Sequence, residues 1–182
     1  MPSPRRRRQD QAPSESAPIT VNGWAIYAHP LFIDQLEALA GEVEHLRAAD
    51  PAGYRQKKKT KLLAAIYKMA FEVIPQNPAD RAFFQGNTLS SAYRHWHRGK
   101  FFEGRYRLFL RYSTAAKAIV LAWVNDEETL RTYGSKADAY SVFKGMLIRN
   151  QPPDDWDALL QEAKAGVSRA KGLLKRASSP RK

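Results

Sequence analysis

The sequence contains no cysteine, no long hydrophobic run and few acidic residues, and each absence excludes a class of protein. Without cysteine there can be no disulfide, no thiolate nucleophile and no cysteine-based zinc site. No apolar run approaches the roughly 18 residues that a membrane span needs. The basic N-terminus also lacks the apolar core of a secretory signal. We therefore expect a soluble, cytoplasmic protein without a membrane partner.

The shortage of acidic residues produces a strong charge imbalance. Asp and Glu number 18 against 30 Lys and Arg, which gives a formal net charge of +12. Such an imbalance favours nucleic acid, an anionic membrane surface or an acidic protein as the partner. The length of 182 residues fits one domain with tails and is sufficient for a real core.

The common catalytic motifs are missing as well. The chain has no P-loop, no Gly-x-Gly-x-x-Gly and no Gly-x-Ser-x-Gly, and its acids form no promising pair for acid/base work. His95 and His97 have the spacing of two neighbouring metal ligands. They lack a further ligand, and the surrounding cations oppose a metal ion. We expect neither a metal nor another cofactor.

The ends of the chain differ in composition from its centre. Residues 1–18 contain four prolines and the Arg5–Arg8 run, which predicts a disordered basic arm. We expect the main domain over residues 19–150. Residues 151–182 follow Pro152 and Pro153 and predict a basic amphipathic helix or tail, for which docking, partner binding and fraying all stay open.

Two helices are predicted in the first half of the domain. An apolar stripe begins after Pro30 and runs to Leu46, which predicts one helix. Asp50 is the expected N-cap of a second helix, which ends before Pro75. Two such helices joined by a short loop are expected to form an antiparallel hairpin.

Strands and a further helix follow. Strand patterns cover residues 95–102 and 105–112, and the apolar run 117–124 predicts a central strand buried on both faces. An approximate capping box at Ser135 and Asp138 predicts a helix that ends near Arg149. The order favours an α+β fold, with helices packed against an antiparallel sheet.

The most informative segment lies on the predicted strand 105–112. Period-two alternation places Arg105, Arg107, Phe109 and Arg111 on one face, and the core residues on the other. Alternate arginines repel one another unless an anion bridges them, so this face predicts contact with phosphates. Arg98 and Lys100 share a face of the preceding segment, and a neighbouring strand would bring them beside these arginines.

Cations and tyrosines suit RNA cleavage by the internal 2′-hydroxyl, because the substrate then supplies the nucleophile. Arginines can stabilise the charge on phosphorus with two hydrogen bonds at once. Positive neighbours favour the neutral form of a lysine, which makes Lys100 a candidate for proton transfer. The same surface would equally suit a non-catalytic RNA- or DNA-binding module, or the docking of an acidic partner.

Several long stretches resemble the YhaV family of bacterial type II toxins. They cover about residues 20–160 and are the segments 21–30, 104–112, 123–134, 136–143 and 152–156. This family is grouped with the RelE superfamily of toxin ribonucleases. The resemblance implies an N-terminal helical hairpin on an antiparallel sheet of about four strands, followed by C-terminal helices.

The resemblance also implies an activity and partners. It implies a metal-independent endoribonuclease that cleaves mRNA in a manner linked to translation and so inhibits growth. The implied antitoxin resembles PrlF and carries an AbrB-like swapped-hairpin DNA-binding domain. Toxin and antitoxin together would bind operator DNA.

The RelE-type pattern assigns roles to individual residues. Arg98 and Lys100 match a cation pair on one strand, and Arg107 matches the arginine of a Tyr-Arg-Leu strand motif. Tyr140 is our choice for the further catalytic tyrosine, although packing in the core would explain it almost as well. Four further cations are expected to hold substrate: Arg105, Arg111, Arg131 and Lys136. The identity of the general base stays open between Lys100 and a tyrosine.

Overall fold

The fold is built on a mixed five-stranded sheet. The computed structural model describes residues 17–130 and 134–178. The strands are β1 (Ile19–Val21), β2 (Trp24–Ala28), β3 (His97–Phe101), β4 (Tyr106–Ser113) and β5 (Ala118–Val124). Their spatial order is β1-β2-β5-β4-β3, with β2 parallel to β5 and every other pair antiparallel. All seven residues of β5 are buried, as predicted for a central strand.

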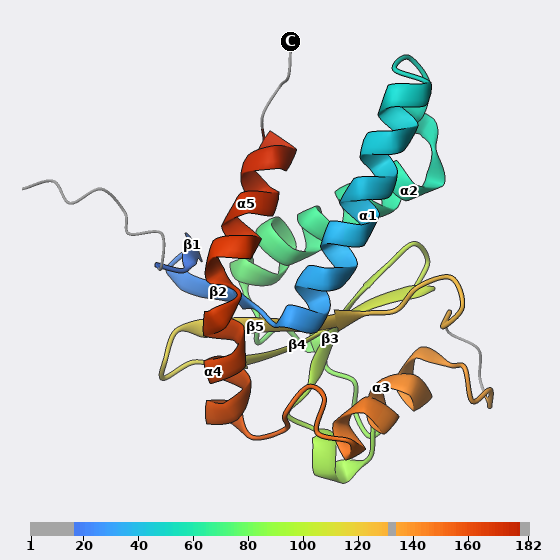
Figure 1. The fold of residues 1–182 in the computed structure, drawn as a ribbon. Coiled ribbons are helices and arrows are strands. Elements are labelled where there is room, and N and C mark those ends of the chain that lie inside the picture. Colours follow the sequence, from blue (N-terminus) through green and yellow to red (C-terminus); the bar gives the residue numbers. More distant parts are fainter. Residues whose placement is uncertain (1–16, 131–133, 179–182) are drawn as a thin grey trace, which may run out of the picture.

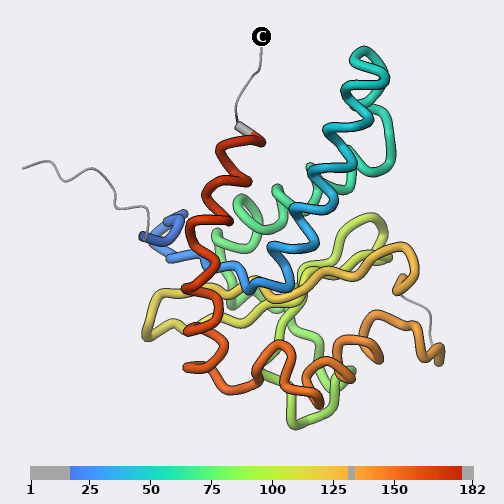
Figure 2. Tube along the Cα trace, viewed as in Figure 1, coloured from blue at the N-terminus to red at the C-terminus, as the bar shows by residue number. Residues whose placement is uncertain are grey.

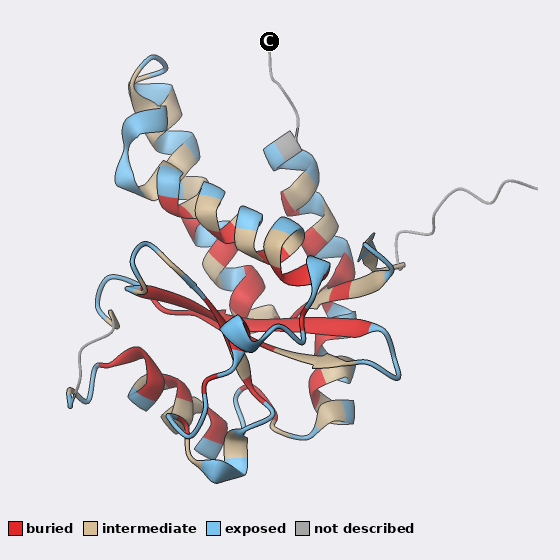
Figure 3. Cartoon of the chain, turned by 180° about the vertical axis from the view of Figure 1, so that it is seen from behind, coloured by how far each residue is buried: buried red, intermediate tan, exposed pale blue. Residues whose placement is uncertain are grey.

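Five α-helices surround this sheet. They are α1 (Pro30–Ala49), α2 (Lys58–Lys68), α3 (Ala139–Ile148), α4 (Trp156–Ala165) and α5 (Val167–Ser178). The helices α1, α2 and α5 share one apolar core with a face of the sheet. The helices α3 and α4 share a second core with the opposite face. Figures 1 and 3 show the resulting three layers, with the buried centre of the sheet in the middle.

The sheet differs from the prediction in two respects. It has five strands rather than about four, and it is not purely antiparallel. Asn22 and Gly23 form the tight turn that makes β1 and β2 a hairpin, both with positive φ angles. The chain then passes through α1, α2, β3 and β4 before it reaches β5, and this long connection allows β2 and β5 to run parallel.

The second helix begins later than predicted. Asp50 ends α1 instead of starting α2, because its backbone N–H bonds to the Leu46 carbonyl and its carboxylate accepts a hydrogen bond from the Gly53 N–H. The helix α2 begins at Lys58. It continues as a π-turn (Met69–Val73) and then as a 3-10 turn (Ile74–Gln76) that contains Pro75, so the helical segment extends slightly beyond the predicted end. The helices α1 and α2 pack together on the sheet, as the predicted hairpin requires.

The last predicted helix is two helices, and both dock on the domain. They separate at Gly166, where an added Cβ would lie 2.4 Å from Ile33 Cδ1, so only glycine permits this close approach. Both helices contact β2 (Figure 2). Arg169 on α5 also bonds to Asp34 and Glu37 on α1. Docking on the domain is therefore seen for both helices, and partner binding stays a prediction. None of the described helices has the length and apolarity to cross a bilayer.

Candidate active site

The predicted cation cluster forms on the β3–β4 hairpin. Lys100 lies directly opposite Arg107 in the antiparallel register, and Arg98 lies opposite Phe109. Residues opposite one another share a face of a sheet, so the three cations lie on the α3 side. The sequence pattern placed the core residues on the opposite face only. In the structure this face is also partly covered, because Phe109 packs against Phe143 of α3 with ring centroids 4.2 Å apart.

Arg98 is buried and fixed at two points. Its Nε donates to the Tyr140 hydroxyl at 2.9 Å, and its Nη1 donates to the Ala82 carbonyl at 2.7 Å. Only 7% of the residue is exposed. The guanidinium is thus held between α3 and the short helical turn Arg81–Phe83.

Arg107 approaches the same tyrosine from the other strand. Its guanidinium carbon lies 5.2 Å from the centre of the Tyr140 ring, and its Nη1 donates to the Gly104 carbonyl. Its Nε is buried without a hydrogen-bond partner in the described structure. Tyr140 is buried near the start of α3, and both arginines contact it.

The turn between the two strands shapes the rim of this cluster. Phe102, Glu103 and Gly104 all have positive φ angles, and only glycine adopts that conformation without steric cost. A Cβ at Gly104 would lie 3.8 Å from Arg107 Nη2 and 3.9 Å from Lys100 Cδ. Lys100 itself is exposed. The turn therefore lies beside both the exposed Lys100 and the buried Arg107, which face each other across the hairpin.

Asn125 fixes the backbone of Arg107, and the sequence reasoning missed it. Its Oδ1 accepts a hydrogen bond from the Arg107 N–H at 2.5 Å, and its Nδ2 donates to the Arg105 and Thr129 carbonyls, each at 3.0 Å. Asn125 is 2% exposed. The available signal was its position, because it directly follows the buried strand β5.

The electrostatics of the cluster favour an anion. Among the described residues, neither Arg98 nor Arg107 forms a salt bridge with an acid. Asp138 is a buried acid two residues before Tyr140. Its carboxylate caps α3 by accepting a hydrogen bond from the Tyr140 N–H. Burying a charge without a counter-charge is costly. A bound phosphate would supply that counter-charge.

The other predicted substrate-binding residues lie in different surroundings. Arg105 is exposed just before β4, and Lys136 is exposed before α3. Arg131 lies outside the described residues. Arg111 is placed four residues beyond Arg107 on β4, where its guanidinium lies between the Trp96 and Trp156 rings and donates to the Asp154 carbonyl.

The two histidines of the weighed metal pair have separate partners. His95 contacts the Asp154 carboxylate at 2.6 Å, whereas His97 packs between the rings of Phe84 and Tyr112. Burial, with the charges of Arg111, His95 and Arg98, lowers the pKa of His97 to about 4. No group of three or more metal-ligating side chains is found within the described ranges.

Two buried arginines and an exposed lysine on the β3–β4 hairpin meet a buried tyrosine of α3. The class of protein is therefore a mixed α/β protein with a cation cluster whose chemistry suits a phosphate group. Comparison with known proteins specifies the class further. A family profile described as a toxin with endonuclease activity, of a toxin–antitoxin system, matches residues 26–164. The chain belongs to this YhaV toxin family.

The similarity to individual relatives extends over most of both chains. The ribonuclease toxin YhaV of Escherichia coli K12 is 53% identical over 146 residues, which cover 80% of this chain and 95% of the relative. Toxin YhaV from strains O6:H1 and O157:H7 matches to the same extent. No solved structure matches the chain.

Proposed function

We propose that the protein is an endoribonuclease toxin that cleaves mRNA. Its proposed active site consists of Arg98, Lys100, Arg107 and Tyr140. The observation that carries the proposal is the burial of two arginines around one tyrosine, with no acid paired to either among the described residues. Membership of a toxin family with endonuclease activity and the ribonuclease name of the K12 relative support it.

The proposed reaction needs no nucleophile from the protein. The 2′-oxygen of a ribose forms a bond to the adjacent phosphorus, and the bond from phosphorus to the 5′-oxygen breaks. The 2′-hydroxyl gives up its proton and the departing 5′-oxygen takes one up. The products are a 2′,3′-cyclic phosphate and a 5′-hydroxyl, and the reaction consumes no water and requires no metal.

Each residue has a part in this reaction. Arg98 and Arg107 stabilise the charge on the phosphorane, because their guanidinium groups are already positioned before the charge develops. Lys100, exposed at the rim, assists proton transfer. The hydroxyl of Tyr140 already accepts from Arg98, and its ring lies under Arg107, which favours a role in orienting both.

A cleavage assay with a labelled mRNA tests the proposal, with and without ribosomes. We expect cleavage of RNA and none of the same strand made with 2′-deoxyribose. Arg98→Ala is expected to lower the rate by about 100-fold or more, as for the loss of one donor to a transition-state oxyanion. Lys61→Ala is the matched control, because Lys61 is exposed on α2 across the sheet.

Two results would contradict this mechanism. Full cleavage by Arg98→Ala would remove the site assignment. Salt-dependent RNA binding without any cleavage product, on ribosomes or off them, would leave only a phosphate-binding module.

The proposed partners follow from the proposed function. We propose a PrlF-like antitoxin with an AbrB-like swapped-hairpin domain, and operator DNA as a ligand of the toxin–antitoxin complex. The setting is the cytoplasm, where mRNA is translated. We also propose that the fold is RelE-like. The layer of helices on the sheet supports this, as does the Tyr-Arg-Leu motif, residues 106–108, on β4.

A further inference from the structure

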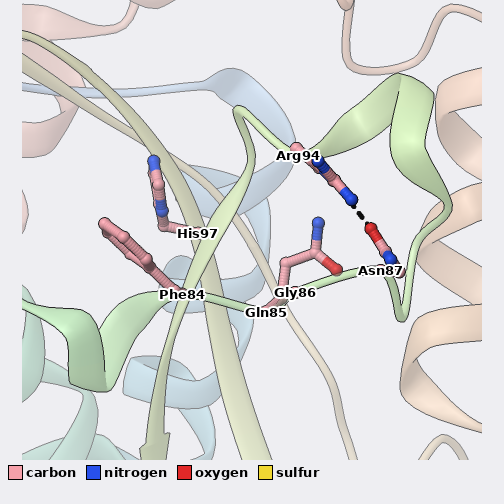
Figure 4. A pocket seen from close by; sticks show the side chains of 6 residues that line it. All are labelled: Phe84, Gln85, Gly86, Asn87, Arg94 and His97. Atoms are coloured by element: carbon pink, nitrogen blue, oxygen red, sulfur yellow. Dashed lines mark hydrogen bonds between the residues drawn. The ribbon is translucent and has the colours of Figure 1, made fainter.

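A pocket at the edge of the sheet adjoins the proposed active site, because His97 lines the pocket and the next residue on β3 is Arg98. Six residues line it, five from the segment that precedes β3 and one, His97, from β3 itself: Phe84, Gln85, Gly86, Asn87, Arg94 and His97 (Figure 4). None of the six is acidic. The segment is attached to the edge strand by an antiparallel bridge between Phe84 and His97.

One wall of the pocket is aromatic. The rings of Phe84 and His97 are 5.2 Å apart and inclined by 38°, and the His97 ring continues to Tyr112 at 5.0 Å. Phe84 is nevertheless 46% exposed, although it is a large apolar side chain. The low pKa of His97, about 4, keeps its ring uncharged at neutral pH, so this wall carries no charge.

The other wall is polar and cationic. Arg94 is exposed, and its Nε donates to the Asn87 Oδ1 at 2.7 Å. Its two Nη groups have no acidic partner within the ranges that the structure describes. Figure 4 shows this pair opposite the two rings, with Gln85 between them.

The base of the pocket is already formed. The buried Gln85 side chain donates to the Tyr93 carbonyl at 3.0 Å and accepts from the Leu89 N–H at 2.9 Å. Gly86 has a φ of +62°, and an added Cβ there would meet nothing within 4 Å. The Gln85 side chain is therefore fixed, and the space beside Gly86 is open.

The pocket and the proposed active site share their supports. His97 and Arg98 are consecutive on β3, and alternation directs them to opposite faces. The segment that carries Phe84 also holds Arg98, because the Ala82 carbonyl accepts from its Nη1. A strand that passes around this edge could thus contact both faces.

From these observations we propose that the pocket is a nucleobase subsite for single-stranded RNA. The base stacks on the exposed face of Phe84, and Arg94 binds the phosphate of the same nucleotide. The inference rests on the proposed function, since it assigns part of the same RNA substrate. Proteins bind single strands by stacking bases on aromatic side chains and placing cations beside the phosphates, and Phe84 and the exposed Arg94 provide both.

Binding to an RNA that cannot be cleaved tests the subsite apart from catalysis. The probe is a short single-stranded RNA with 2′-O-methyl groups, and its fluorescence anisotropy is measured with the full chain. Phe84→Ala is expected to weaken binding by about 5- to 100-fold, the range for the loss of one stacked base. Phe84→Tyr keeps the ring and should bind like the unaltered protein. Tyr54→Ala, in the α1–α2 connection, is the aromatic control and should also bind normally.

Abasic substitution along the probe gives an independent measurement. One abasic position should weaken binding to the unaltered protein but cause no further loss in Phe84→Ala, because both changes remove the same stacking contact. Arg94→Gln should reduce the slope of log affinity against log salt by about 0.7.

The outcomes separate this inference from the proposed function. Suppose that the protein cleaves mRNA, but that Phe84→Ala binds the probe as tightly as the unaltered protein and loses as much affinity at abasic positions. This result would overturn the subsite and leave the proposed function intact. Loss of antitoxin binding by Phe84→Ala with unchanged RNA binding would assign the pocket to the protein partner and also overturn it. A protein that never cleaves RNA but shows the predicted abasic pattern would keep the subsite and refute the catalysis.

Discussion

Two arginines on one strand, Arg107 and Arg111, differ in what surrounds them and therefore in what they can do. Arg111 lies between two tryptophan rings and donates to the Asp154 carbonyl. Arg107 contacts one tyrosine ring and donates to the Gly104 carbonyl, and the Nε of each arginine is buried without a hydrogen-bond partner in the described structure. The difference is that Arg111 has a second aromatic ring and the nearby acids Asp154 and Asp155 to stabilise its charge.

The comparison shows that spacing on a strand does not define a functional set. Arg111 joins β4 to the turn before α4, which makes it a structural contact. Burial lowers the pKa of Arg111, whereas the nearby Asp154 and Asp155 raise it. Arg107 forms no salt bridge with an acid among the described residues, and in the proposed function the phosphate of the RNA supplies its counter-charge.

The largest expected effect is on catalysis, in Arg107→Met. We expect RNA cleavage to fall by about 100- to 1,000-fold, because a preorganised donor to the phosphorane is lost. The free energy of unfolding should stay the same or rise, because a buried charge without a paired acid is replaced by an apolar side chain. Cleavage assays and urea unfolding measure the two quantities. Strong destabilisation would show that Arg107 is structural after all.

The second prediction reverses this result at Arg111. Arg111→Met should lower the free energy of unfolding by about 2–4 kcal/mol, because it removes the contacts with two tryptophan rings and the bond to Asp154. The cleavage rate of the folded fraction should change less than about 10-fold, since no donor to the phosphate is lost. If cleavage fell as far as in Arg107→Met, the two arginines would not differ as described.

The third prediction concerns the group that positions Arg107. Asn125→Ala should destabilise the protein by about 1–3 kcal/mol, because it leaves buried partners unsatisfied. It should lower kcat more than it raises KM, since the phosphate contacts remain but are misplaced. Thr60→Ala is a control, because its buried hydroxyl has no hydrogen-bond partner in the described structure. An equal loss of kcat in the control would indicate a general defect.

Much of the fold follows from local patterns. The stripe after Pro30 predicted α1, and the apolar run 117–124 predicted the central strand. The parallel pairing of β2 with β5 could not be predicted in this way, because it depends on residues about 90 positions apart. Asp50 misled because an aspartate before a proline fits a helix start, whereas here it ends one.

The shared face of the candidate site residues could be predicted from the sequence, but their burial could not. Alternation placed Arg98, Lys100 and Arg107 on one face, and the structure brings them together with Tyr140. The alternation could not show that α3 covers part of that face, because a helix that follows in sequence can pack on either side. Asn125 was missed because its role depends on three backbone groups that come together only in the fold.

The smallest expected effect is on the titration of His97, which responds to Arg111 but not to Arg107. His97 has a pKa of about 4, lowered first by burial and then by the charges of Arg111, His95 and Arg98, whereas Arg107 does not contribute. Arg111→Met should therefore raise the pKa of His97 above this value, and Arg107→Met should leave it in place. Histidine ring shifts in NMR spectra measure both.

The same titration has a consequence for stability. The unfolded chain, with a histidine pKa near 6.5, binds the proton before the folded protein does, so stability decreases as pH falls from about 6.5 to about 4. His97→Phe removes that proton site, and its melting temperature should fall less over this range than that of the unaltered protein. An identical decline would mean that His97 is not held neutral. A shift of the His97 pKa in Arg107→Met equal to that in Arg111→Met would show that the two ends of β4 are electrostatically coupled, and so less distinct than their contacts indicate.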